Sequence, residues 1–314
     1  MIRRLYLKLR NTRFARQVVR LSRKIILPGF DGLPLYDVMG FFLKGLLNGA
    51  ITTRASSVAF KFFVALFPAI IVVFTIIPYI PVQGFQQALL DTIGGFLPEN
   101  FFVMVKSTIE DIVMRQRGSL LSIGFILAFY FSSNGIVGMI AAFNNTTHSI
   151  ETRPLYKQYL ISLLLVVILA AILLLAVAMI VSGTAVLNYL VTLGIMEGSL
   201  VFYLMLTGKW LIVVMMLFFA ISFMYYLAPA RRTRFRFISA GSSLATVLFI
   251  SATLGFNYYV NNFASYNAIY GSIGTLIVIM MWFYFNSLAL IIGYELNASI
   301  RNAGVQYEEK HPSE

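Results

Sequence analysis

The sequence predicts an all-α polytopic membrane protein with six transmembrane helices and additional amphipathic helices at the membrane surfaces. Of its 314 residues, 59% are hydrophobic and only 11% are charged, which is too little charge to cover the surface of a soluble domain. Several stretches also approach or exceed the roughly 20 apolar residues that cross a bilayer. The chain has no cysteine, so disulfides and thiolate metal sites are excluded.

Six apolar stretches give the expected spans. They cover residues 57–80, 120–142, 160–182, 209–228, 237–258 and 273–300. In the first, Pro68 can kink the helix, because proline removes one backbone donor and clashes with the preceding turn. The sequence therefore divides into a cytoplasmic basic arm with an interfacial helix (1–39), a six-helix transmembrane domain (40–300) and a short cytoplasmic tail (301–314).

The distribution of lysine and arginine predicts that both termini are cytoplasmic. With that orientation, the inside segments hold 19 of the 24 basic residues, as the positive-inside rule requires. The net charge of +12 then reflects orientation and anionic lipid rather than nucleic acid, for which no motif is recognisable. One short loop is expected to contact the inner leaflet through Arg231, Arg232, Arg234 and Arg236.

Several segments outside the spans are predicted to lie on the membrane. Near the N-terminus, apolar residues recur at helical spacing among many cations: Phe14, Val18, Leu21 and Ile25. This pattern is typical of a helix on the inner leaflet; the alternative is a disordered basic tail. Residues 40–54 form a second amphipathic stretch. On the outside, residues 83–117 are expected to form short surface helices, with the stripe Phe101, Val105, Ile109 and Ile112, and residues 183–208 to do the same.

Ionisable side chains within spans are rare and are functional candidates by default. Glu295 in the sixth span lies six residues before Arg301, and Lys61 in the first span lies seven residues after Arg54. At 1.5 Å per residue, these positions have similar depth beneath the cytoplasmic face. We therefore expect Glu295 to face Lys61 or Arg54. The pair could be structural, Lys61 could instead extend to the interface, or the charges could relay a proton or a substrate.

A polar cleft between spans two, five and six is a further hypothesis. Small residues let helices approach closely, and polar side chains can bond across them, so interhelical packing is the competing interpretation. The residues assigned to the cleft are Ser132, Ser133, Asn134, Asn286, Tyr284, Gly241 and Gly255. An uncharged outer turn that could cap this cleft contains Tyr266, Asn267, Tyr270 and Gly271.

No catalytic or metal-binding pattern emerges from the sequence. The histidines, His148 and His311, are isolated, and neither an HExxH motif nor a P-loop or GxSxG elbow is present. We therefore expect no metal, no cofactor and no enzymatic activity.

The last third of the chain resembles the YihY/BrkB family of bacterial inner-membrane proteins. The resemblance rests on "YLAPARRTRFRFISAGSSLA" and on "NNFASYNAIYGSIGTLIVIMMWFYFNSLALIIGYELNA". The second stretch carries a YxxxYGSxG turn, a helix with Trp282 and Tyr284, and a closing G-x-E-L-N-A from Gly293. Residues 40–300 share the likeness, although many members are expected to have an aromatic residue at Lys61. That departure weakens a pair with Lys61 as a family-wide feature and leaves Arg54 as the alternative partner of Glu295.

This resemblance implies a six-span inner-membrane protein of poorly defined activity. Members have been labelled virulence factors and, at times, ribonuclease BN. A lone intramembrane carboxylate argues against RNA hydrolysis, which needs a water-facing acid, base or metal cluster. The leading hypothesis is transport or flipping of a lipid or another amphiphilic solute, with membrane lipids as partners. The alternative is a non-transporting envelope scaffold, and a membrane ribonuclease is a distant third.

Overall fold

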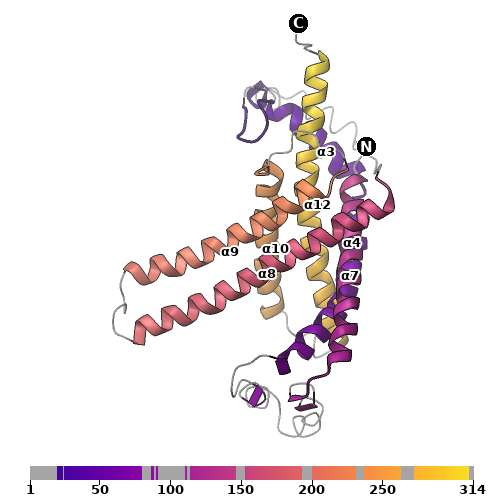
Figure 1. Cartoon of the computed structure of the whole chain (residues 1–314). Helices are drawn as coiled ribbons and strands as arrows, with labels where there is room; N and C mark the ends of the chain where they lie inside the picture. The colour runs from indigo at the N-terminus through magenta and orange to yellow at the C-terminus, as the bar shows by residue number, and fades with distance from the viewer. Residues whose placement is uncertain are drawn as a thin grey trace. The chain divides into compact units, whose positions relative to one another are not determined.

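The computed structural model of the chain (Figure 1) describes residues 20–23, 25–79, 86–87, 90, 110–111, 114–145, 153–192, 200–230, 237–262 and 272–310. All regular structure within these ranges is helical, so the predicted all-α class is confirmed. The elements are α3 (Leu35–Asn48), α4 (Ile51–Ile76), the 3-10 turn η1 (Ile77–Tyr79), α7 (Gly118–Asn144), α8 (Leu155–Thr192), α9 (Leu200–Leu227), α10 (Ala240–Asn262) and α12 (Ser272–Lys310).

Six of these helices are long and apolar enough to cross a membrane, as predicted: α4 continued by η1, α7, α8, α9, α10 and α12. Their ends differ from the expected ones. Helix α4 begins at Ile51, and α12 continues to Lys310. A helix does not stop where the membrane stops, so the hydrophobic stretch gives only a lower limit for its length.

The prediction of separate surface helices over residues 183–208 is wrong. Helix α8 continues to Thr192 and α9 already begins at Leu200. Gly183 and Gly208 each lower helix stability by about 1 kcal/mol, which weakens a long apolar helix without ending it. The two helices run antiparallel beside one another (Figure 1). At their contact, a Cβ atom on Gly183 would lie 2.9 Å from Cδ of Lys209.

The chain forms two compact units, Phe60–Gly135 and the remainder. In the smaller unit, glycines of α7 pack against large side chains of α4. A Cβ atom at Gly135 would lie 3.2 Å from the ring of Phe62, and one at Gly124 would lie 3.0 Å from Ile71. Helix α4 continues through Pro68.

The larger unit is organised around α12, which packs against α10 and α3. All eight residues from Gly293 to Ile300 are buried. Because successive helical residues are 100° apart, a run of eight covers every side of the helix, and this section is therefore enclosed all round. Part of the enclosure is a cluster in which Val38 of α3 meets Leu296, Ile300 and Ala303 of α12.

Candidate functional site

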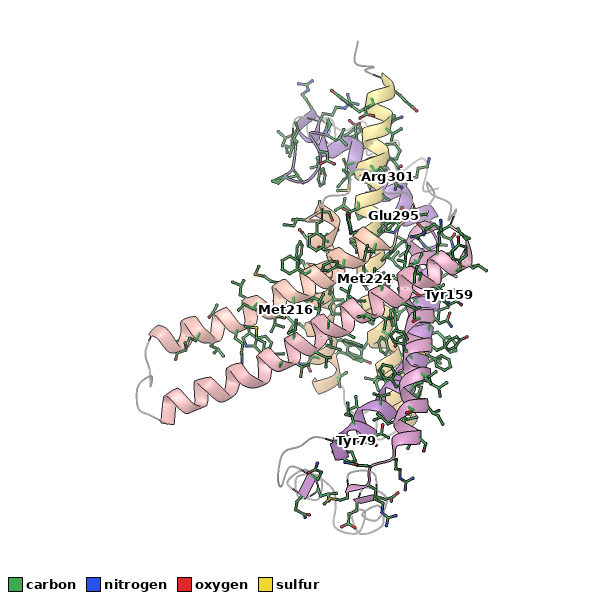
Figure 2. All side chains as sticks on the ribbon, viewed as in Figure 1. Tyr79, Tyr159, Met216, Met224, Glu295 and Arg301 are labelled. Carbon is green, nitrogen blue, oxygen red and sulfur yellow. The ribbon has the colours of Figure 1, made fainter. Side chains whose placement is uncertain are left out.

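A buried ion pair joins α4 to this enclosed section of α12. Nη2 of Arg54 lies 3.4 Å from Oε2 of Glu295, and the side chains are only 9% and 1% exposed. Nη1 of Arg54 donates a hydrogen bond to the carbonyl oxygen of Ala142 at 2.7 Å. Ala142 lies in the last turn of α7, where carbonyl groups lack partners within the helix. One guanidinium group therefore connects α4, α7 and α12; Figure 2 labels Glu295 on the last of these.

The hydrogen bonding of this pair is incomplete. Nε of Arg54 and Oε1 of Glu295 are both buried without a hydrogen-bond partner in the described part of the chain. A buried charged group that lacks one of its bonds destabilises the folded state. The site thus holds one unused donor and one unused acceptor beside each other.

Two glycines at the end of α3 cover the pair. A Cβ atom at Gly45 would overlap Oε1 of Glu295 and lie 2.8 Å from its Cδ. A Cβ atom at Gly49 would lie 2.9 Å from Nη2 of Arg54. Only residues without a side chain fit here, so the backbone of α3 closes the site. Neither glycine belongs to the site predicted from the sequence; their spacing of four within the amphipathic stretch 40–54 was the available signal.

An aromatic cluster lies next to Glu295 along α12. The rings of Phe143 and Tyr294 stack with centroids 4.4 Å apart, and Tyr225 meets both rings nearly edge-on. The hydroxyl of Tyr225 donates to the carbonyl oxygen of Leu290 at 2.5 Å. All three side chains are at most 1% exposed. Tyr294 precedes Glu295 and Phe143 follows Ala142 in the sequence, so this buried apolar cluster adjoins the charge pair. Electrostatic attraction is stronger in such low-dielectric surroundings.

Helices α10 and α12 meet at a pair of glycines. A Cβ atom at Gly241 would overlap the carbonyl oxygen of Gly293, and one at Gly293 would lie 2.6 Å from the carbonyl oxygen of Gly241. Beside this contact, Oδ1 of Asn297 accepts from the Gly241 amide at 2.8 Å, and Nδ2 donates to Oγ of Ser239 at 2.8 Å. Asn297 thus caps the N-terminus of α10, whose first amides have no partner within the helix.

The other predicted charge, Lys61, belongs to the smaller unit and is half-buried. Among the described residues, no ion pair includes it. Arg54 is therefore the cation that the structure brings to Glu295. The expected contact of spans one and six, which are α4 and α12, is made by the long side chain of Arg54. The main packing partners of α12 are α10 and α3.

The residues assigned to the polar cleft fall in both units. Ser132, Ser133 and Asn134 belong to the smaller one, where Oγ of Ser133 donates to the carbonyl oxygen of Phe129 in its own helix. In the larger unit, Nδ2 of Asn286 donates to the backbone carbonyl oxygen of Trp282 at 2.9 Å. Its Oδ1 accepts from the hydroxyl of Thr253 at 3.3 Å.

Three further cleft residues have different surroundings. Tyr284 is half-buried. Gly255 has open space where a Cβ atom would be, but Gly241 lies in the tight α10–α12 contact. The cleft as a whole stays a prediction.

Several predicted residues lie outside the described ranges. They are Tyr266, Asn267, Tyr270 and Gly271 of the outer turn; Arg231, Arg232, Arg234 and Arg236 of the basic loop; His148 and His311; Phe14 and Val18 of the basic arm; and Phe101, Val105, Ile109 and Ile112 of the outer segment. Within the described ranges, no group of three or more His, Asp or Glu side chains is arranged to hold a metal ion.

Comparisons with a family model and with related proteins place the chain in one family. The model of the family described as "Virulence factor BrkB" matches residues 42–314. The "Putative ribonuclease-like protein YfkH" of Bacillus subtilis is 29% identical over 246 residues, which cover 78% of this chain and 88% of that protein. A UPF0761 membrane protein of Aliivibrio salmonicida is 26% identical over 270 residues, covering 83% and 82%.

A UPF0761 membrane protein of Alteromonas mediterranea is 25% identical over 281 residues, covering 88% of this chain and 92% of that protein. No solved structure matches the chain significantly. The matched range 42–314 of this chain contains the charge pair, the aromatic cluster and the glycine contact. With six helices able to cross a membrane, this chain belongs to the BrkB family and is an integral membrane protein.

Proposed function

We propose that the protein moves a lipid or another amphiphilic solute across the bacterial inner membrane, with both termini in the cytoplasm. The observation that carries this proposal is the incompletely bonded charge pair of Arg54 and Glu295 within apolar helices. A charge pair kept only for stability can often be replaced by apolar residues without loss. Ionisable groups kept inside membrane domains more often serve substrates, ions or protons.

The chemistry of the pair suits an amphiphile with a polar headgroup. A guanidinium group binds phosphate or carboxylate through two parallel hydrogen bonds, and Nε of Arg54 is an unused donor. The carboxylate of Glu295 can receive an amine or a proton, and Oε1 is an unused acceptor. In a zwitterionic headgroup, the anionic part would then bind Arg54 and the cationic part would bind Glu295, in place of the contact between the two side chains.

A non-transporting scaffold is the second candidate, and one specific observation favours it. The pair lies in the section of α12 that is buried on every side, from Gly293 to Ile300. In a scaffold, the pair would fix the register of three helices, as buried polar groups do in some helical assemblies. A ribonuclease has less support, because no group of three or more His, Asp or Glu side chains among the described residues could hold a catalytic metal ion.

Reconstitution into liposomes with fluorescent phospholipids separates the two candidates. A membrane-impermeant quencher measures how fast labelled lipid moves between leaflets, for wild type, Glu295→Gln and the control Glu308→Gln. Glu308 is an exposed acid on the same helix. We expect labelled lipid to change leaflet faster with wild type and with Glu308→Gln than in empty liposomes. With Glu295→Gln, we expect this rate to be at least tenfold lower than with wild type. If folded wild-type protein gives the same translocation rate as empty liposomes, for both zwitterionic and anionic lipids, lipid flipping is rejected and the scaffold is favoured.

A further inference from the structure

Helix α3 has two apolar faces, and among the described residues only one of them packs against the rest of the chain. Its inner face packs Val38, with Phe41 and Phe42, against α12. On its outer face, four large apolar side chains are exposed: Tyr36 at 38%, Met39 at 37%, Leu43 at 51% and Leu47 at 83%. Their spacing of three, four and four residues places them in one stripe along the helix.

The position of this stripe along the chain fixes where it lies relative to the membrane. Helix α3 ends at Asn48, and the membrane-spanning helix α4 begins at Ile51. Only Gly49 and Ala50 separate the two helices, and Ala50 has a positive φ of 46°. Three Cα–Cα steps reach at most about 11 Å, so the end of the stripe is held close to the level where α4 starts.

Cationic groups accompany the stripe. The guanidinium carbon of Arg23 lies 4.9 Å from the ring centre of Tyr36, and Lys44 is exposed beside Leu43. Residues 21–27 add exposed apolar side chains next to the start of α3, where the Leu35 amide donates to the carbonyl oxygen of Ile25. Apolar side chains edged by cations and aromatic rings are typical of helices in the headgroup region of a bilayer.

We propose that the outer face of α3, made of Tyr36, Met39, Leu43 and Leu47, lies in the phospholipid monolayer at which α4 begins. Lipid, rather than a second protein, is its partner, because the face is tethered directly to a membrane-spanning helix. The same helix covers the Arg54–Glu295 pair through Gly45 and through Gly49, the residue directly after its end. Lipid contact on one side of α3 therefore holds the cover over the charge pair on the other. This proposal does not depend on whether the chain transports anything.

The absence of cysteine allows a direct test with single-cysteine variants that carry a nitroxide label. Leu43→Cys and Leu47→Cys place the label on the stripe, and Asp37→Cys places it on an exposed charged position of the same helix. In phosphatidylcholine–phosphatidylglycerol vesicles, oxygen collisions report the lipid phase, and collisions with a water-soluble nickel chelate report water. Leu47 is 83% exposed, so its replacement leaves the packing of the fold intact.

We expect oxygen collisions to exceed nickel-chelate collisions several-fold at positions 43 and 47, and the reverse at position 37. Dominant nickel-chelate collisions at both stripe positions would overturn the proposal. Dipolar broadening that disappears when labelled protein is diluted with unlabelled protein would overturn it too, because a second copy would then occupy the face. The spectra report position rather than activity, so a failed translocation assay would leave this result unaffected.

Discussion

The backbone of Gly45 in α3 lies directly against the carboxylate of Glu295 in α12, with no room for a Cβ atom between them. Gly45 and Glu295 lie 250 positions apart in the sequence, so the contact is not local. It exists because α3 packs against α12 before α4 begins. The contact helps to keep the acid buried, with 1% of its surface exposed. It also makes residue 45 a sensitive probe of the whole site.

Replacing Gly45 by alanine should therefore destabilise the protein, whereas Gly40→Ala should not. Overpacking a buried contact costs about 1–3 kcal/mol, and here the displaced group is charged. Gly40 lies in the same helix with open space around it, so alanine there should raise stability by about 0.5–1 kcal/mol through helix propensity. Thermal unfolding of the two variants in one detergent measures the difference; equal midpoints would contradict the proposed cover.

The contact of α10 with α12 should show the same contrast between two glycines of one helix. Gly241→Ala would push the backbones of Gly241 and Gly293 apart and should cost about 2 kcal/mol or more. Gly255→Ala meets nothing within 4 Å and should be neutral or slightly stabilising. Unfolding free energies in mixed lipid–detergent micelles test this pair of variants. A loss of stability at Gly255 as large as that at Gly241 would show that α10 is packed differently.

Asn297→Ala removes the cap of α10 and should cost about 1–2 kcal/mol. Asn302→Ala is the matched control on the same helix, since Nδ2 of Asn302 has no hydrogen-bond partner among the described residues. Amide hydrogen exchange gives a local readout. We predict faster exchange in the first turn of α10 for Asn297→Ala only; unchanged protection of the Gly241 amide would argue against the cap.

The number and order of the membrane helices could be predicted because length and hydrophobicity suffice for that purpose. The end of α8 and the start of α9 could not be predicted, since Gly183 and Gly208 look like helix boundaries in the sequence. Within a long apolar helix, the cost of one glycine is smaller than the cost of exposing unpaired backbone groups to lipid. Continuation to Thr192 and a start at Leu200 follow from that balance.

The candidate site could be predicted only in outline. Equal depth of Glu295 and a cation of the first span follows from helix rise, but Arg54 and Lys61 lie on nearly the same helical face. What brings Arg54 to Glu295 is a second contact, the carbonyl oxygen of Ala142, which has no side-chain signature. The ring stack beside it also depends on tertiary packing, because Phe143, Tyr225 and Tyr294 come from three distant helices.

The central claim is that Arg54 allows the acid Glu295 to lie buried in α12. The coupling energy between the two residues tests this claim most directly. Unfolding free energies of Arg54→Met, Glu295→Met and the double variant give this energy from a double-mutant cycle. An uncompensated buried charge costs about 3–5 kcal/mol, while an apolar replacement of both charges can be nearly neutral. The surface pair of Arg115 and Asp111, which are 76% and 31% exposed, is the control, with an expected coupling below about 1 kcal/mol. Arg117, which also pairs with Asp111, is left unchanged in every control variant.

We predict that each single Met variant of the buried pair loses about 3 kcal/mol or more, and that the double variant recovers most of this loss. The coupling should then exceed about 2 kcal/mol. Additive losses, with a coupling no larger than that of Arg115 and Asp111, would contradict the claim that Arg54 is what allows an acid to lie buried in α12.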